Sequence, residues 1–235
     1  MPDFWYQERH KKTHPSASKI LGFLKTIHNF ESVVDLGCGV GTWLYSAKEI
    51  GAKKIQGFDA SKIDPAHLMI SSSEFQRFDL NIPFEATTKF DLGISLEVAE
   101  HINATSADTY LELLCTLSPF ILFSAAIPGQ GGTGHVNEQE PLYWIKKFSN
   151  QGFEVFDVIR PKIWNDTEIL PWYKQNCFLF VKKDLVPTIK NEVENLEDWK
   201  GKYIVHPYFF EMKNEQLMSP IKLTKAFAKL LINKH

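Results

Sequence analysis

The stretch DLGCGVG, from Asp35 to Gly41, decides the predicted fold of this chain. It follows SVV, a short β-branched run, and precedes TWLYSAKEIG at residues 42–51, where apolar residues recur at helical spacing. The glycines at 37, 39 and 41 let the backbone turn tightly and approach a ligand without a side-chain clash. The stretch therefore predicts a buried strand, a turn that binds a nucleotide-like ligand, and a helix.

Short apolar runs alternate with helical stretches on both sides of this turn. Residues 20–27, 106–117 and 140–150 carry apolar residues at helical spacing. Strands that alternate with helices favour a mostly parallel sheet covered on both faces. We therefore predict an α/β fold with a three-layer, doubly wound sheet. Its strands are expected at residues 32–37, 53–60, 74–80, 90–96, 120–126, 153–160 and 176–183.

The last two predicted strands have no crossover helix between them. Residues 161–175 join them, contain two prolines and are predicted to form a loop, so the pair is expected to be antiparallel at the sheet edge. After Asp184 the pattern weakens until Ser219 and Pro220, which open a further predicted helix. We expect one domain at residues 1–183, including an N-terminal lid segment, and a C-terminal extension at residues 184–235 packed on it.

Composition and charge narrow the class of protein. The net charge of −2, with acidic and basic residues mixed, argues against nucleic acid as a partner. The longest apolar stretch, residues 119–127, is too short to span a bilayer, and the N-terminus shows no secretory pattern. Cys38, Cys115 and Cys177 are widely separated, which predicts neither a disulfide framework nor a metal site. We expect a cytoplasmic protein that acts on a small molecule and binds no metal; a homo-oligomer is compatible with the sequence.

Carboxylates at the ends of successive strands extend the predicted ligand site. Asp59 ends the strand after the turn, where a carboxylate can accept hydrogen bonds from both hydroxyls of an adenosine ribose. Asp79 ends the next strand, where it can meet an adenine amino group. Asp35 precedes the first glycine and suits a cofactor with an amino group and a sulfonium better than one with a diphosphate. The set favours S-adenosylmethionine over a nicotinamide dinucleotide.

Four motifs in order, DLGCGVG, FDAS, RFDLNIPF and FDLGISLEVAEHI, resemble those of class I S-adenosylmethionine-dependent methyltransferases. The resemblance covers roughly residues 30–183 and implies a seven-stranded sheet whose last strand inserts antiparallel. It also implies which residues hold the cofactor. Those expected beside its methionine portion are Asp35, Gly37, Cys38, Gly39, Leu96 and Glu97; those expected at the ribose are Asp59 and Ala60; those expected at the adenine are Asp79 and Leu80.

The segment AIPGQGGTGHVNEQEPLYW, residues 126–144, follows the fifth predicted strand at the edge where such sheets bind ligands. Its glycines predict a mobile substrate loop, and His135 after them could remove a proton from an acceptor hydroxyl. A structural histidine that orders the loop is the alternative. His101 is placed near the site by its motif. Tyr6 and His10, in an aromatic and basic stretch ahead of the first predicted helix, could close over the acceptor.

This loop, RPKIW at residues 160–164 and PWYKQN at residues 171–176 together resemble bacterial methyltransferases of surface-polysaccharide and other glycan biosynthesis. The resemblance implies that Asn137 and Glu138 handle the acceptor beside His135. Arg160 could meet a phosphate, and Trp164 could line the acceptor pocket. These residues predict O-methylation of a small-molecule, sugar or phosphate-bearing, nucleotide-linked intermediate of capsule or polysaccharide biosynthesis.

Two other functions compete with this prediction. Tyr143 and Lys147 have the YxxxK spacing of nicotinamide-dependent short-chain reductases, but the glycine spacing of the turn and Asp35 argue against that family. An inactive subunit that binds the cofactor and stabilises an active partner would carry the same motifs. Only an assay of methyl transfer separates this second alternative from an enzyme.

Overall fold

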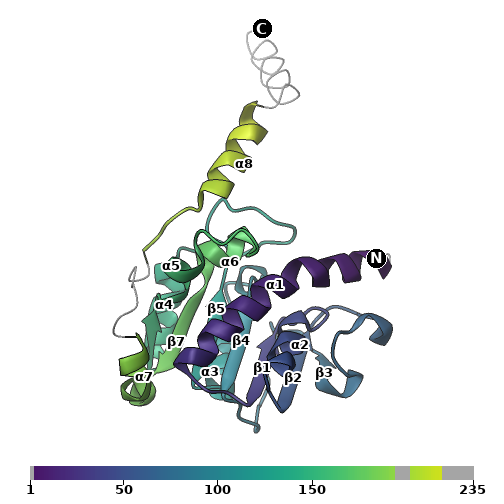
Figure 1. The fold of residues 1–235 in the computed structure, drawn as a ribbon, viewed down its shortest axis with the longest axis vertical. Coiled ribbons are helices and arrows are strands. Elements are labelled where there is room, and N and C mark those ends of the chain that lie inside the picture. The colour runs from purple at the N-terminus through teal and green to yellow at the C-terminus, as the bar shows by residue number, and fades with distance from the viewer. Residues whose placement is uncertain (1–2, 194–201, 219–235) are drawn as a thin grey trace. The chain divides into compact units, whose positions relative to one another are not determined.

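The computed structural model describes residues 3–193 and 202–218. The chain falls into two compact units, Met1–Tyr203 and Ile204–His235. The first unit carries the whole sheet (Figure 1) and continues past the predicted boundary at residue 183, because Ile189 of α7 (Val186–Val193) is buried in its core. The second unit contains α8 (Pro207–Met218). The helix predicted to open at Ser219 and Pro220 lies outside the described residues.

The sheet confirms the predicted seven-stranded fold, with the order β3-β2-β1-β4-β5-β7-β6. All pairings from β3 to β5 are parallel, whereas β7 runs antiparallel to β5 on one side and to β6 on the other. The edge pair is therefore antiparallel, as predicted. The strands are β1 (Ser32–Leu36), β2 (Lys54–Asp59), β3 (Phe75–Arg77), β4 (Leu92–Leu96), β5 (Phe120–Ser124), β6 (Phe153–Phe156) and β7 (Phe178–Lys182).

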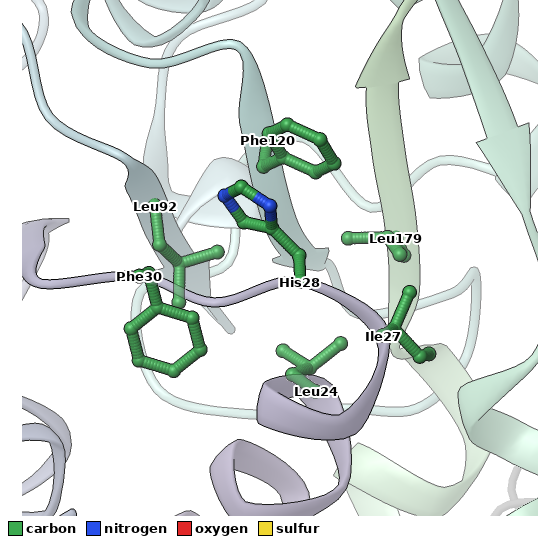
Figure 2. A pocket seen from close by; sticks show the side chains of 7 residues that line it. All are labelled: Leu24, Ile27, His28, Phe30, Leu92, Phe120 and Leu179. Atoms are coloured by element: carbon green, nitrogen blue, oxygen red, sulfur yellow. The ribbon is translucent and has the colours of Figure 1, made fainter. Parts of the chain in front are cut away.

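The amino edge of the parallel strands is closed by apolar packing. His28 follows α1 (Asp3–Ile27), and its ring stacks on Phe120 with 3.6 Å between ring centroids. The small cavity around it is lined by aliphatic and aromatic side chains from α1, β4, β5 and β7 (Figure 2). This lining offers a nucleoside no carboxylate, whereas the predicted cofactor residues lie at the opposite, carboxyl edge.

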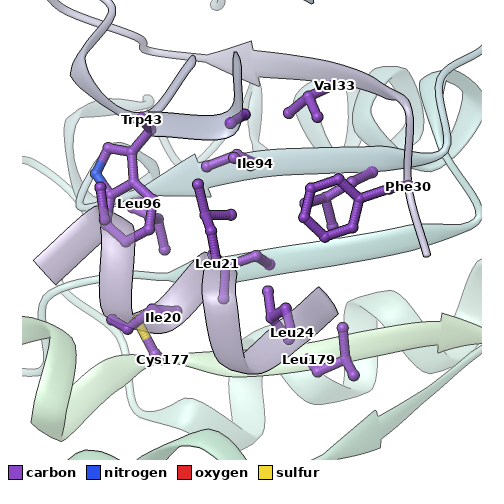
Figure 3. Packing of buried hydrophobic residues seen from close by; sticks show 14 of the residues in the cluster. Ile20, Leu21, Leu24, Phe30, Val33, Trp43, Ile94, Leu96, Cys177 and Leu179 are labelled. Carbon is purple, nitrogen blue, oxygen red and sulfur yellow. The ribbon is translucent and has the colours of Figure 1, made fainter. Parts of the chain in front are cut away.

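Two apolar layers cover the sheet, because successive strand residues face opposite sides. Val33 and Leu179 point into one layer with α1, α2 (Thr42–Glu49) and α5 (Ile159–Ile163), while Val34 and Phe178 point into the other. Figure 3 shows the first layer, where residues of α1 lie across the strands. The second layer contains α3 (Ala107–Leu117) and α4 (Pro141–Asn150). None of the described helices combines the length and apolar character needed to cross a bilayer.

The helix α1 is much longer than predicted. It begins at Asp3 and includes Pro15, so the aromatic and basic stretch expected ahead of it is its first half. Short turns of 3₁₀ helix lie between the longer elements: η1 (Pro65–His67), η2 (Ser72–Glu74), η3 (Ala99–His101) and η4 (Lys183–Leu185).

The prediction that residues 161–175 form a loop is wrong. Two short helices occupy it, α5 and α6 (Pro171–Asn176), and β6 ends at Phe156, before the predicted Arg160. Pro171 is the first residue of α6, where its missing N–H costs nothing, so it starts a helix there instead of breaking one. Pro161 lies in the first turn of α5 for the same reason.

Candidate functional site

The glycine-rich turn lies at the carboxyl end of β1. Gly37 has φ 87°, and a Cβ added there would stand 2.3 Å from a methyl carbon of Val98, so both the conformation and the space require glycine. The backbone N–H groups of Gly37 and Cys38 donate to the carbonyl oxygen of Phe58 at 2.7 and 3.0 Å. These bonds fix the turn to the end of β2.

Two carboxylates flank this turn. Asp35 is 2% exposed, and burial, with Asp59 nearby, raises its pKa well above the ordinary value. The Asp59 carboxylate accepts hydrogen bonds from the backbone N–H of Gly39 at 2.7 Å and of Ser61 at 2.8 Å. Within the described part of the chain, no lysine or arginine forms a salt bridge with either residue. The two carboxylates at this turn are therefore not neutralised by a salt bridge within the described residues, and a cationic ligand would suit them.

The remaining residues predicted at the adenosine end differ in exposure. Asp79 is exposed, and its Oδ1 accepts bonds from the backbone and side-chain nitrogens of Asn81 at 2.9 and 3.0 Å. Leu80 is buried and Ala60 is exposed. The Cys38 side chain packs in the core beside Gly57, so a contact of Cys38 with the cofactor through its backbone stays a prediction. Only its backbone belongs to the turn.

Glu97 follows β4 directly and has a conformation that non-glycine residues rarely adopt, with φ 56°. Its Oε1 accepts from Asn176 Nδ2 at 3.0 Å and its Oε2 from Gln130 Nε2 at 2.8 Å. Burial raises the pKa of its carboxyl group above the ordinary value. Such local strain persists where surrounding contacts hold it, and it is typical of functional sites. Glu97 thus lies at the carboxyl edge of the sheet, where β1 carries the glycine-rich turn, and its contact with the methionine portion stays a prediction.

A network of amides supports Glu97 from three segments that are far apart in the sequence. Gln130 Oε1 accepts hydrogen bonds from Gln175 Nε2 at 2.9 Å and from Asn176 Nδ2 at 2.8 Å. The backbone oxygen of Gln175 accepts from Arg160 Nη1 at 3.1 Å. Residues of the loop 126–144 and of the segments 160–164 and 171–176, which carry the narrower resemblance, therefore meet in one bonded network.

His135 lies in the loop after β5, held by Glu138. The Glu138 carboxylate faces His135 Nδ1 at 2.7 Å and accepts from the backbone N–H of Gly129 and Gly131 at 2.8 and 3.0 Å. The hydrogen bond to His135 and these two backbone bonds outweigh burial and lower the pKa of Glu138. Glu138 therefore orders the loop and orients the histidine, and both its oxygens are already engaged with protein donors.

His101 and Glu100, in the turn η3 after β4, lie beside His135. The rings of His101 and His135 are perpendicular, with centroids 4.9 Å apart, and His101 Nδ1 is 3.1 Å from the oxygen of Gly134. Glu100 is 1% exposed, and burial, with Glu97 nearby, raises its pKa to about 9. Burial also lowers the pKa of His101. The two candidate histidines thus share one place at the carboxyl edge.

Several residues predicted to bind the acceptor have other roles. Arg160 is 0% exposed, and its guanidinium pairs with buried Asp157, so its assignment to an acceptor phosphate is wrong. Asn137 is 3% exposed and accepts from Gln139 Nε2, which makes it a buried part of the loop. Trp164 is half-buried at the end of α5.

The predicted lid residues lie on α1. The ring of Tyr6 stacks on His67 with centroids 4.7 Å apart, and His10 Nδ1 is 3.2 Å from Thr42 Oγ1 at the start of α2. This part of α1 therefore lies along the segments that follow the turn and β2. Closure of a lid over an acceptor stays a prediction.

The YxxxK pair of the reductase alternative lies on the outer side of α4. Lys147 forms a salt bridge with Asp108 of α3, and its Nζ lies 4.9 Å from the centre of the Tyr143 ring. Both side chains belong to the packing between α3 and α4, so no observation at this helix favours a reductase.

Sequence reasoning missed four polar residues of the site, Glu100, Gln130, Gln175 and Asn176. Gln175 and Asn176 end α6, one residue before β7 begins, and that position next to a predicted strand is the signal that could have found them. Glu100 belongs to the motif EVAEHI and directly precedes His101, a position in the same turn that could have indicated it.

Comparison with known proteins agrees with this geometry. Residues 6–119, just under half of the chain, match the family model described as a methyltransferase domain. A mitochondrial ubiquinone biosynthesis O-methyltransferase from Dictyostelium discoideum is 32% identical over 88 residues. That match spans 31% of this chain and 27% of the length of the curated relative.

Solved structures share the architecture at low identity. DesVI of Streptomyces venezuelae has a TM-score of 0.55 at 14% identity, over 76% of this chain and 95% of that one. Magnesium protoporphyrin IX methyltransferase of Synechocystis PCC 6803, with bound S-adenosylhomocysteine, has a TM-score of 0.54 at 18% identity, over 72% of this chain and 82% of that one. CalS10, an amino pentose methyltransferase of Micromonospora echinaspora with bound S-adenosylmethionine, has a TM-score of 0.52 at 10% identity, over 77% of this chain and 97% of that one. The chain therefore has the fold of the class I S-adenosylmethionine-dependent methyltransferases.

Proposed function

We propose that the chain is an S-adenosylmethionine-dependent methyltransferase that methylates an oxygen of a small-molecule acceptor. The observation that carries this proposal is the pair of carboxylates at the glycine-rich turn. Asp35 is buried, Asp59 is bonded to the turn, and no described lysine or arginine forms a salt bridge with either. A cofactor that brings an ammonium and a sulfonium offsets this negative charge, whereas a diphosphate would add to it.

The transfer is an in-line displacement in which the acceptor oxygen bonds to the methyl carbon and the sulfur–carbon bond breaks. Alignment of the reactants supplies much of the acceleration, worth roughly 7–11 kcal/mol in well-oriented reactions. The acceptor hydroxyl must also lose its proton. His135 is the candidate base, because its Nδ1 faces the Glu138 carboxylate, which can only accept, so the neutral ring keeps its lone pair on Nε2.

For the acceptor, we propose a sugar-like hydroxyl compound of capsule or other polysaccharide biosynthesis. The support is the bonded network that joins the three segments of the narrower resemblance through Gln130, Gln175 and Arg160. Buried Arg160 gives no support for a phosphate on the acceptor. The polar residues around Glu97 and His135 suit an acceptor rich in hydroxyl groups.

Calorimetric titration tests the cofactor. S-adenosylhomocysteine should bind, and NAD and NADP should not. Asp59→Asn should weaken the affinity for S-adenosylhomocysteine about tenfold or more, because a hydrogen bond to a charged acceptor is worth about 1.5–3 kcal/mol. Asp108→Asn, on the surface of α3, is the matched control and should bind like the wild type. Binding of NAD without any response to S-adenosylhomocysteine would overturn the proposal.

Transfer of a labelled methyl group tests the activity. A panel of nucleotide sugars, free sugars and phenolic acceptors should include one that is methylated, and His135→Ala should lower its turnover by about 10² or more. The same variant should keep its affinity for S-adenosylhomocysteine. A protein that binds the cofactor and methylates nothing in such a panel would favour the inactive partner subunit.

A further inference from the structure

Three side chains at the carboxyl edge have the composition of a metal site. Glu100, His101 and His135 each present a nitrogen or oxygen atom, and these atoms lie within 4.8 Å of one another. His135 Nε2 is 3.9 Å from Glu100 Oε1. Two residues come from the turn after β4 and the third from the loop after β5, so the fold brings them together from separate segments.

Hydrogen bonds to both histidines leave the nitrogen that a metal needs. The Glu138 carboxylate and the Gly134 carbonyl can only accept, so each histidine donates through Nδ1. His135 Nδ1 is 2.7 Å from Glu138 Oε1, and His101 Nδ1 is 3.1 Å from the Gly134 oxygen. Each neutral ring then keeps its lone pair on Nε2. A carboxylate or a backbone carbonyl that holds the far nitrogen is the usual outer contact of a metal-binding histidine.

The carboxylate of the cluster has an unused oxygen. Glu100 is 1% exposed, and among the described residues no group donates a hydrogen bond to its Oε2. Burial favours the protonated form of this group, and a cation that takes the place of the proton would meet the oxygen that lacks a donor. This observation is independent of the histidine geometry and points to the same missing partner.

We propose that Glu100, His101 and His135 bind one divalent transition-metal ion. Two imidazoles and a carboxylate favour Zn²⁺, Mn²⁺ or Fe²⁺ over Mg²⁺ and Ca²⁺, which prefer oxygen ligands. Metal–ligand bonds of about 2.0–2.2 Å would bring the three ligand atoms closer together than they are in the structure. The glycine-rich loop that carries His135 can move to allow this. Three protein ligands leave positions open for a further oxygen.

A catalytic role for this metal ion rests on the proposed methyltransferase function, whereas metal binding itself does not. The open position would take the acceptor hydroxyl and lower its pKa, so that its proton leaves to water before the oxygen bonds to the methyl carbon. His135 Nε2 would then be a ligand and not the base, because one lone pair cannot serve both. A turnover that depends on the metal ion distinguishes the two roles, because only the role of ligand requires the ion.

Calorimetry on untagged, chelator-treated protein tests the site with Zn²⁺, Mn²⁺ and Mg²⁺ alone. One Zn²⁺ or Mn²⁺ per chain should bind more tightly than Mg²⁺, and the absorption of bound Co²⁺ should report nitrogen ligands. Replacing Glu100 by Gln, or His101 or His135 by Ala, should weaken binding by about 100-fold or more, and Glu138→Gln by about tenfold. His14→Ala, outside the cluster, should leave this site unchanged.

Gly132→Ala tests the site while keeping every ligand. A Cβ at Gly132 would stand 2.1 Å from His135 Nε2, so the added methyl group should displace the ring and weaken metal binding. Gly22→Ala, whose Cβ meets nothing within 4 Å, is the matched control. The inference fails if no transition-metal ion binds, or if the cluster variants bind it as the wild type does. Titration of the same samples with S-adenosylhomocysteine separates that failure from a failure of the proposed function.

Discussion

At the scale of single residues, the structure assigns Arg160 to stability. Its Nε donates to Asp157 Oδ1 at 2.7 Å, its Nη2 donates to the other carboxylate oxygen and to the Lys202 carbonyl, and its guanidinium lies over the Phe178 ring. Both members of the pair are fully buried. A buried ion pair stabilises little in itself, but the loss of one partner leaves an uncompensated charge in the core.

Arg160→Met should therefore destabilise the protein by about 3–5 kcal/mol in urea unfolding, because Asp157 would remain buried without its partner. The double variant Arg160→Met with Asp157→Leu should recover much of that loss. Lys162→Met, exposed on the same helix, should unfold like the wild type. A stable Arg160→Met protein whose only defect is a raised KM for the acceptor would instead support the phosphate contact.

The residues that the sequence can and cannot place in the fold differ in where their partners lie. Asp35, the glycines and Asp59 are predictable because the turn needs them within a few residues of a strand end. Arg160 and Glu100 are not, because burial comes from elements far away in the sequence. Asp157, three residues from Arg160, was the only local sign that the guanidinium had a partner within the chain.

At the scale of elements, the end of α1 closes the amino edge of the sheet through His28. Its Nε2 is buried, and among the described residues it has no hydrogen-bond partner. Burial lowers the pKa of His28 below its ordinary value of 6.5, although Asp91 nearby acts in the opposite direction. The neutral ring is therefore the form that stacks on Phe120.

Acid should destabilise this contact. The unfolded chain takes up a proton on His28 near pH 6.5, whereas the folded chain does so only at a lower pH, so the contribution is complete above pH 6.5 and is lost as the pH falls. Unfolding free energies at pH 8 and pH 5.5 should differ more for the wild type than for His28→Phe. His10 and His101 also have lowered pKa values but contribute equally to both proteins. Equal losses for both would contradict the prediction.

The elements show why proline misled the sequence prediction. Pro171 and Pro161 were interpreted as loop residues, yet each lies in the first turn of a short helix, where proline fits. Pro15 lies within α1, and the packing of Ile20, Leu21 and Leu24 on the sheet supports that helix beyond what local propensity indicates. The strands were easier to predict, because their apolar runs are short and several end at glycine or acidic residues.

At the scale of the whole molecule, the described chain divides after Tyr203 and not after residue 183. Ile189 of α7 is 2% exposed within the first unit, and the Lys202 carbonyl accepts a hydrogen bond from Arg160. The described residues after 183, up to Tyr203, therefore belong to the same unit as the sheet. The packing of residues 204–235 on it stays a prediction.

A chain that ends at Tyr203 should fold and bind S-adenosylhomocysteine with an affinity within about twofold of the full-length chain, because it keeps α7 and the Lys202 carbonyl. A chain that ends at Lys183 should be markedly less stable, since it exposes the core that Ile189 covers. Ile189→Ala in the full-length protein checks this without truncation and should cost about 2–5 kcal/mol in urea unfolding. If the chain ending at Tyr203 were folded but failed to bind the cofactor, residues 204–235 would have to contribute to the site, and the second unit would be a working part of the enzyme.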